Sequence, residues 1–102
     1  MNLCGLVKQK DYELINNEAA GQYEFHIDGV VAKIEYNRKG DKIYLIHTEV
    51  PRALAGRGVA SSLAEKVLND IQQKGYKLIP FCPFVKKYIQ RHTEWEFLIL
   101  KD

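Results

Sequence analysis

The sequence has few cysteines, little net charge and no long apolar run. Among its 102 residues are two cysteines, Cys4 and Cys82, whose wide separation argues against a disulfide framework and for reduced thiols. The formal net charge is +2, and no basic stripe interleaves with the aromatics, so nucleic acid is not an expected partner. No apolar run reaches the roughly 20 residues that span a bilayer, and residues 1–8 lack the regions of a signal peptide. We therefore expect a cytoplasmic protein with no membrane partner.

Metal-ligand spacing is also lacking. The three histidines and two cysteines show no zinc-type pattern, so we expect no metal site. With 46% hydrophobic and 27% charged residues, the composition is that of an ordinary globular protein. A chain of this length builds one core, so we expect a single domain over residues 1–102. We also expect a monomer.

Strand patterns fill the N-terminal half of the chain, from Leu14 to Val50. Apolar and polar residues alternate there, and the runs are separated by turn signals at Asp28-Gly29 and over Asn37–Asp41. Consecutive hairpins of this kind form an antiparallel meander. The expected strands are Gln22–Ile27, Val30–Tyr36 and Lys42–Val50.

After Pro51 the apolar period becomes helical. Apolar residues recur every three or four positions from Val59 to Ile71, and Gly75 stands where a helix C′ residue belongs. The pattern then predicts a short strand over Tyr76–Pro80 and a second helix from Pro83 to Arg91, capped by Cys82 and followed by His92. The tail Glu94–Leu100 is expected to pack back as a last strand or an irregular segment. Together these elements predict one α+β layer structure.

A glycine-bearing turn, Gly56-Arg57-Gly58-Val59-Ala60, joins the strand half to the first helix. The first N–H groups of a helix lack intrahelical acceptors, and glycines let an anion approach the backbone. Arg57, Ser61 and Ser62 add side-chain donors, although glycines in this position are also common as simple turn residues. The spacing fits neither a P-loop nor a dinucleotide-binding fingerprint, so a phosphate cradle and a plain helix start both remain open.

Gly56-Arg57-Gly58-Val59-Ala60, with Leu63 one turn on, resembles the acyl-CoA pyrophosphate loop of the GNAT superfamily of N-acetyltransferases. Ala55 departs from that pattern, because the superfamily has Gln or Arg at this first loop position. The resemblance extends over Ile15 to Leu98 and is to the small single-domain members. Further motifs carry it: His47–Pro51, Pro80–Val85, Tyr88-Ile89 and Arg91-His92-x-Glu94.

The resemblance implies a GNAT-like fold: a curved, mostly antiparallel sheet with two helices in the C-terminal half and two neighbouring strands that splay apart. It further implies an acetyl-CoA-dependent N-acetyltransferase that moves an acetyl group to an amine acceptor, either a small molecule or a protein. The residues implied to contact the cofactor are Thr48, Glu49 and Val50 beside the pantetheine, Arg57, Gly58, Val59, Ala60, Ser61 and Ser62 around the pyrophosphate, Cys82 near the thioester, Lys87 at a CoA phosphate, and Phe84.

Acetyl transfer to an amine needs a base and an acid, or a thiol that takes the acetyl group first. Cys82, at a helix cap where the dipole favours a thiolate, is either such a group or a buried inert cysteine. Glu49 is a candidate general base or a strand-end carboxylate in solvent. His47, two residues earlier and on the same strand face, is a candidate proton relay or a packed residue.

Two other functions stay open at this stage. The chain lacks the N-terminal helices that shape an acceptor pocket in larger GNAT enzymes, so it is alternatively an acyl-CoA-binding module with little or no transferase activity. It is also alternatively a small protein-interaction domain on the same fold. The sequence does not name the amine acceptor.

Overall fold

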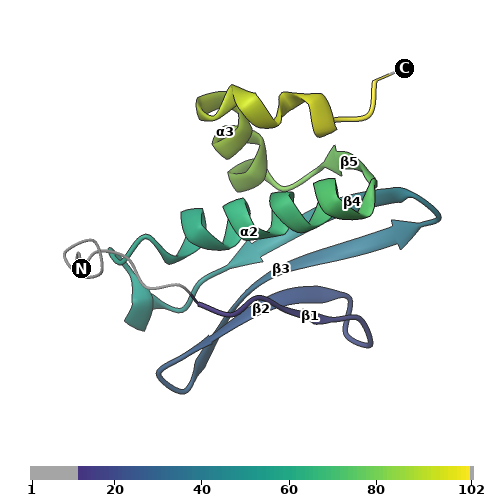
Figure 1. The fold of residues 1–102 in the computed structure, drawn as a ribbon. Helices are drawn as coiled ribbons and strands as arrows, with labels where there is room; N and C mark the ends of the chain where they lie inside the picture. The colour runs from purple at the N-terminus through teal and green to yellow at the C-terminus, as the bar shows by residue number, and fades with distance from the viewer. Residues whose placement is uncertain (1–11, 102) are drawn as a thin grey trace, which may run out of the picture.

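The computed structural model describes residues 12–101. A five-stranded sheet in the order β1-β2-β3-β4-β5 carries helix α2 across one face, and α3 lies with the C-terminal segment near β5 (Figure 1). The strands are β1 (Ile15–Asn17), β2 (Gln22–Ile27), β3 (Val30–Lys39), β4 (Lys42–Glu49) and β5 (Lys77–Pro80). The helices are α2 (Val59–Lys74) and α3 (Pro83–Arg91), with shorter 3₁₀ segments η1 (Arg52–Leu54) and η2 (Thr93–Leu98).

The sheet is antiparallel from β1 to β4, and only β4 and β5 run parallel. The β2–β3 hairpin closes at Asp28-Gly29, where both residues have positive φ values of 51° and 82°. Two consecutive positive φ angles are typical of the tight turn whose twist matches that of the strands. The predicted fold class, a mostly antiparallel α+β sheet, is therefore confirmed.

The core lies between the sheet and its helices. Helix α2 buries one stripe of side chains against the sheet, as its period predicts, and ends at Gly75 with φ 74°. Strand residues on alternate positions supply the other half of the core, and α3 closes one side. The buried members of this cluster include Tyr23, Phe25, Ile34, Ile43, Leu45, Leu63, Leu68, Ile71, Leu78, Val85 and Ile89.

The C-terminal segment begins as the sequence predicts and ends less regularly. Helix α3 starts at Pro83, after Cys82 at the N-cap, and stops before His92. The tail then makes the 3₁₀ turn η2 and a single parallel bridge between Leu78 and Ile99, at the edge of β5. Neither described helix is long and apolar enough to cross a membrane.

Candidate functional site

Strands β4 and β5 separate at the middle of β4. They pair from Lys42 opposite Lys77 to Leu45 opposite Pro80. There the N–H groups of Phe81 and Cys82 both donate to the Leu45 carbonyl, each at 2.9 Å, and β5 ends. The remainder of β4 continues along β3 with no β5 partner, so among residues 12–101 one backbone edge is open. This is the splay of neighbouring parallel strands that the resemblance implied.

A β-bulge at Ile46 decides which way the end of β4 faces. Tyr36 pairs with Leu45 and Glu35 pairs with His47, so Ile46 has no partner on β3. An extra residue reverses the alternation of side chains beyond it. Leu45 faces the core, and without the bulge His47 would do the same.

Because of the bulge, His47 and Glu49 share the face of the sheet that lies away from α2. Both side chains are exposed, and His47 Nε2 lies 3.8 Å from Glu49 Oε1. Lys33 from β3 joins them, with its Nζ 3.9 Å from Glu49 and 3.2 Å from Glu35. The expectation that His47 and Glu49 occupy one strand face is consistent with this arrangement.

Thr48 points to the opposite face and meets Cys82. Thr48 Oγ1 and Cys82 Sγ lie 3.1 Å apart, across the opening where β4 and β5 diverge. Cys82 is 2% exposed and occupies the N-cap of α3, but its side chain makes no capping hydrogen bond there. The thiol is therefore directed at the splay rather than at the first turn of α3.

The glycine-bearing loop forms a cavity of about 270 Å³ at the start of α2. Gly56 and Gly58 have positive φ values of 78° and 71°, and a Cβ added at either would meet open space. The first intrahelical bond of α2 runs from Ser62 N–H to the Gly58 carbonyl. No described side chain caps this end of the helix. The lining residues are Val50, Pro51, Leu54, Ala55, Gly56, Gly58, Val59, Ala60 and Ser61.

An uncapped helix N-terminus with glycine on its approach fits an anionic group. The N–H groups of Val59, Ala60 and Ser61 have no acceptor within the helix and carry the positive end of its dipole. Val50 and Pro51 connect this cavity to the open edge of β4, since they follow Glu49 directly. The open edge of β4 and the glycine-bearing loop are thus continuous along the chain, and we call this stretch, residues 48–61, the strip.

Several of the predicted cofactor residues lie outside that cavity. Ser62 uses its N–H within α2, and Phe84 packs on α3 with its ring 6.3 Å from that of Tyr88. Lys87 is exposed on α3. Arg57 belongs to the loop but does not line the cavity; its Nη1 donates to Asp28 Oδ2 at 3.1 Å.

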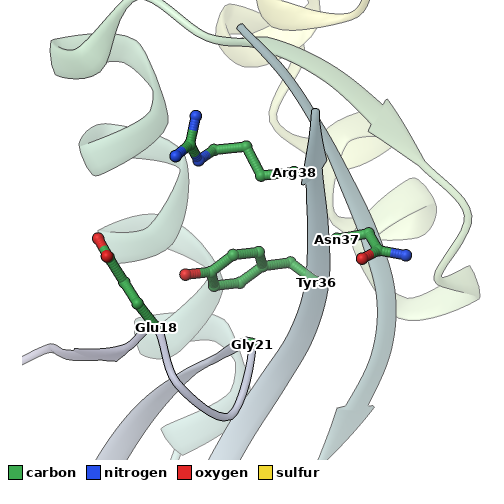
Figure 2. Close-up of a pocket in the computed structure, with 5 residues that line it drawn as sticks. All are labelled: Glu18, Gly21, Tyr36, Asn37 and Arg38. Carbon is green, nitrogen blue, oxygen red and sulfur yellow. The ribbon is translucent and has the colours of Figure 1, made fainter. Parts of the chain in front are cut away.

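A second cavity, of about 260 Å³, lies beside the β1–β2 turn, away from the splay. Figure 2 shows Glu18, Tyr36 and Arg38 around it, with Asn37 directed to the other side of the strand. Two of its polar side chains already have partners: Tyr36 donates to Asn16 Oδ1 at 2.6 Å, and Arg38 donates to the Gly40 carbonyl at 2.6 Å. This cavity holds none of the chemistry-bearing residues singled out in the sequence.

Over residues 12–101, no three His, Cys, Asp or Glu residues lie close enough together to hold a metal ion. Cys4, the second cysteine, falls outside the described residues.

The architecture matches a solved structure at low sequence identity. An NMR structure of a GCN5-like protein from Staphylococcus aureus superimposes with a TM-score of 0.68 over 92% of this chain and 93% of that one. The two sequences are 23% identical, so this likeness establishes the fold. The class is thus the GNAT fold, with its splayed strands and glycine-bearing loop.

The family follows from the sequence comparisons. The family model of GCN5-related N-acetyl-transferases matches residues 22–98, and the chain belongs to this family. The NATD1 proteins of chicken and human are each 34% identical to it over 68 residues. These alignments cover 66% of this chain but only 62% and 60% of the respective relatives, so the chain spans about three-fifths of their length.

The sequence alone did not connect Asp28 and Lys33 with the candidate site. Asp28 was assigned only to a hairpin turn, and Lys33 only to a strand. Their contacts with Arg57 and Glu49 join residues distant in sequence, and only strand pairing brings them together. The Asp-Gly signal did locate the hairpin, but nothing in it indicates the partner of Asp28.

Proposed function

We propose that this chain binds acetyl-CoA along the open edge of β4 and the glycine-bearing loop, and transfers the acetyl group to an amine. The observation that carries the proposal is the continuity of two features. The edge of β4 that β5 leaves unpaired leads directly into an uncapped helix N-terminus. Acetyl-CoA carries amide groups along its pantetheine arm and a pyrophosphate at the far end of that arm. It therefore matches an unpaired strand edge that is followed by free backbone N–H groups.

Each part of the strip has a distinct role in binding. Backbone groups from Thr48 to Val50 would pair with the amides of the pantetheine as an additional strand does. The backbone N–H groups of Val59, Ala60 and Ser61 would hold the pyrophosphate, and Gly58 leaves room for its oxygens. Ala55 supplies no polar side chain, so this binding depends on the backbone and the helix dipole.

Acetyl-CoA held in this way would supply the acetyl group as a thioester, with the amine as acceptor and the CoA thiolate as the leaving group. The amine must lose a proton for this reaction. Glu49 and His47 lie together on the exposed face of β4, with Glu49 also 3.9 Å from Lys33. We assign Glu49 as general base, with His47 relaying the proton to water.

Cys82 lies on the other side of the same strand end. Its thiol shares a hydrogen bond with Thr48 Oγ1 at 3.1 Å, at the residue that precedes the first turn of α3. We assign it as the polar group that lies beside the reacting thioester. Cys82→Ala and Cys82→Ser separate the thiol chemistry from packing, because Ser keeps a polar hydrogen.

The binding step is tested by calorimetric titration with acetyl-CoA. Ser61→Glu places a carboxylate in the first turn of α2, where negative charge stabilises the helix, so the fold is retained. The same carboxylate faces a pyrophosphate, and we expect affinity to fall by at least about tenfold. Ser61→Gln is the matched neutral control and should bind normally. Equal binding by both variants would place the cofactor elsewhere.

The transfer step is tested by release of free thiol in the presence of a panel of amines. Glu49→Gln should lower the rate by about a hundredfold or more, as loss of a general base does, while the dissociation constant for acetyl-CoA stays unchanged. Glu35→Gln, on the same face, is the control. Binding without turnover on any amine would identify an acyl-CoA-binding module instead of an enzyme.

A further inference from the structure

The glycine-bearing loop contains one cationic side chain, Arg57, which is hydrogen-bonded outside the cavity. Arg57 Nη1 donates to Asp28 Oδ2 at 3.1 Å, and Arg57 is not among the residues that line the cavity. The hydrogen bonds with Asp28, and then with Tyr12, raise the pKa of Arg57 above its usual value. The guanidinium is thus fully charged, and a carboxylate already occupies one of its donors.

The fold places Asp28 beside the loop. Asp28 and Gly29 form the tip of the β2–β3 hairpin, and Asp28 has a φ of 51°, in the left-handed region. Asp28 and Arg57 are 29 residues apart in sequence, so the contact depends on the docking of this hairpin against the start of α2. The pair is solvent-accessible, with the side chains 69% and 37% exposed respectively.

We propose that Asp28 weakens cofactor binding by competing with a phosphate of acetyl-CoA for Arg57, an inference that rests on the function proposed above. A carboxylate and a phosphate oxygen are equivalent acceptors for a guanidinium, which binds either through the same donors. Arg57 must therefore give up Asp28 before that donor can bond a phosphate. Because exposed ion pairs are weak, replacing Asp28 by a phosphate at Arg57 costs little free energy. The competition should raise the dissociation constant for acetyl-CoA about two- to fivefold.

Asp28→Asn tests this with the hairpin intact. Asn adopts the left-handed conformation readily, and Asn-Gly is a favoured pair in this turn. Acetyl-CoA is titrated at low salt into the wild type, Asp28→Asn, Arg57→Gln and the double variant. We expect Asp28→Asn to bind about two- to fivefold more tightly than the wild type, and Arg57→Gln to bind more weakly. In the Arg57→Gln background, Asp28→Asn should have no effect.

The double variant separates competition from general repulsion. If Asp28→Asn tightens binding equally in the Arg57→Gln background, the effect is long-range electrostatics and the proposal is wrong. Unchanged or weaker binding by Asp28→Asn alone also overturns it. Asp41→Asn, which removes an exposed carboxylate from the β3–β4 turn at the other end of β3, should leave affinity unchanged.

The two proposals fail in different ways. If the wild type binds no acetyl-CoA, the proposed function is wrong and this inference falls with it. If the wild type binds and Ser61→Glu does not, but Asp28→Asn matches the wild type, only the role of Asp28 is refuted.

Discussion

Glu24 is a buried charge of this sheet, and its replacement by Gln should remove an acid-sensitive part of the stability. The side chain is 7% exposed. Its carboxylate accepts hydrogen bonds from Asn17 Nδ2 at 2.9 Å and Gln22 Nε2 at 2.6 Å, and His26 Nε2 lies 2.7 Å away. The bond with His26, followed by those with Gln22 and Asn17, lowers the pKa of Glu24 from 4.5 to about 2. These contacts also tie β1 to β2.

The pKa shift sets both the sign and the size of the effect. A carboxyl whose pKa is lower in the folded state stabilises the fold above its unfolded pKa, and this contribution is lost as pH falls toward the folded value. A change from 4.5 to about 2 corresponds to about 3 kcal/mol at neutral pH. The wild type should therefore lose that amount between about pH 5 and pH 2 through Glu24.

Chemical denaturation at a series of pH values measures this contribution. At pH 7 we expect Glu24→Gln to be about 2–3 kcal/mol less stable than the wild type, with the difference shrinking steadily below pH 4.5. Glu96→Gln, an exposed carboxylate on η2, is the control and should change stability by less than about 0.5 kcal/mol. A constant difference between Glu24→Gln and the wild type from pH 7 to pH 2 would refute the assignment of the low pKa to Glu24.

Two further substitutions test the packing that supports the site. Tyr23→Phe removes the hydroxyl that donates to Asp70 Oδ2 at 2.8 Å, and should cost about 1 kcal/mol in denaturant unfolding; no change would mean that this partly buried bond contributes nothing. Gly75→Ala forces a Cβ into a residue with φ 74°, and should cost about 1–2 kcal/mol in the same assay without affecting acetyl-CoA affinity. A loss of affinity in Gly75→Ala would show that the two ends of α2 are coupled.

The local elements were predictable because their signals are local. The Asp28-Gly29 turn, the helical period from Val59 onward and Gly75 each act through neighbouring residues, and each occurs where expected. Strand β1 was not separately predicted, because its three residues are too few to show alternation. Its pairing with β2 is established by contacts such as that between Asn17 and Glu24.

The face of the sheet on which the candidate site residues lie was harder to predict, because it depends on the register between β3 and β4. Strict alternation along β4 places His47 on the same face as Leu45, which is buried. The bulge at Ile46 is defined by the pairing of β3 with β4. Isoleucine is an ordinary strand residue, so the sequence at this position does not indicate a bulge. Similarly, the partner of Arg57 is set by where the β2–β3 hairpin docks. The sequence supplied candidate residues for the site, and strand pairing set the directions of their side chains.

The bulge and the splay together explain how one strand end can serve both reactants of the proposed reaction. Alternation after Ile46 directs Thr48 toward Cys82 and its neighbour Glu49 toward the opposite face. The separation of β5 leaves the backbone between them unpaired on one side. The backbone edge is then available to the cofactor, while the carboxylate is reached from the open face of the sheet. An amine that approaches from that face would reach Glu49 without contacting the glycine-bearing loop. Substitution of Glu49 should therefore change the transfer rate and not the affinity for acetyl-CoA, whereas substitution of Ser61 should change that affinity.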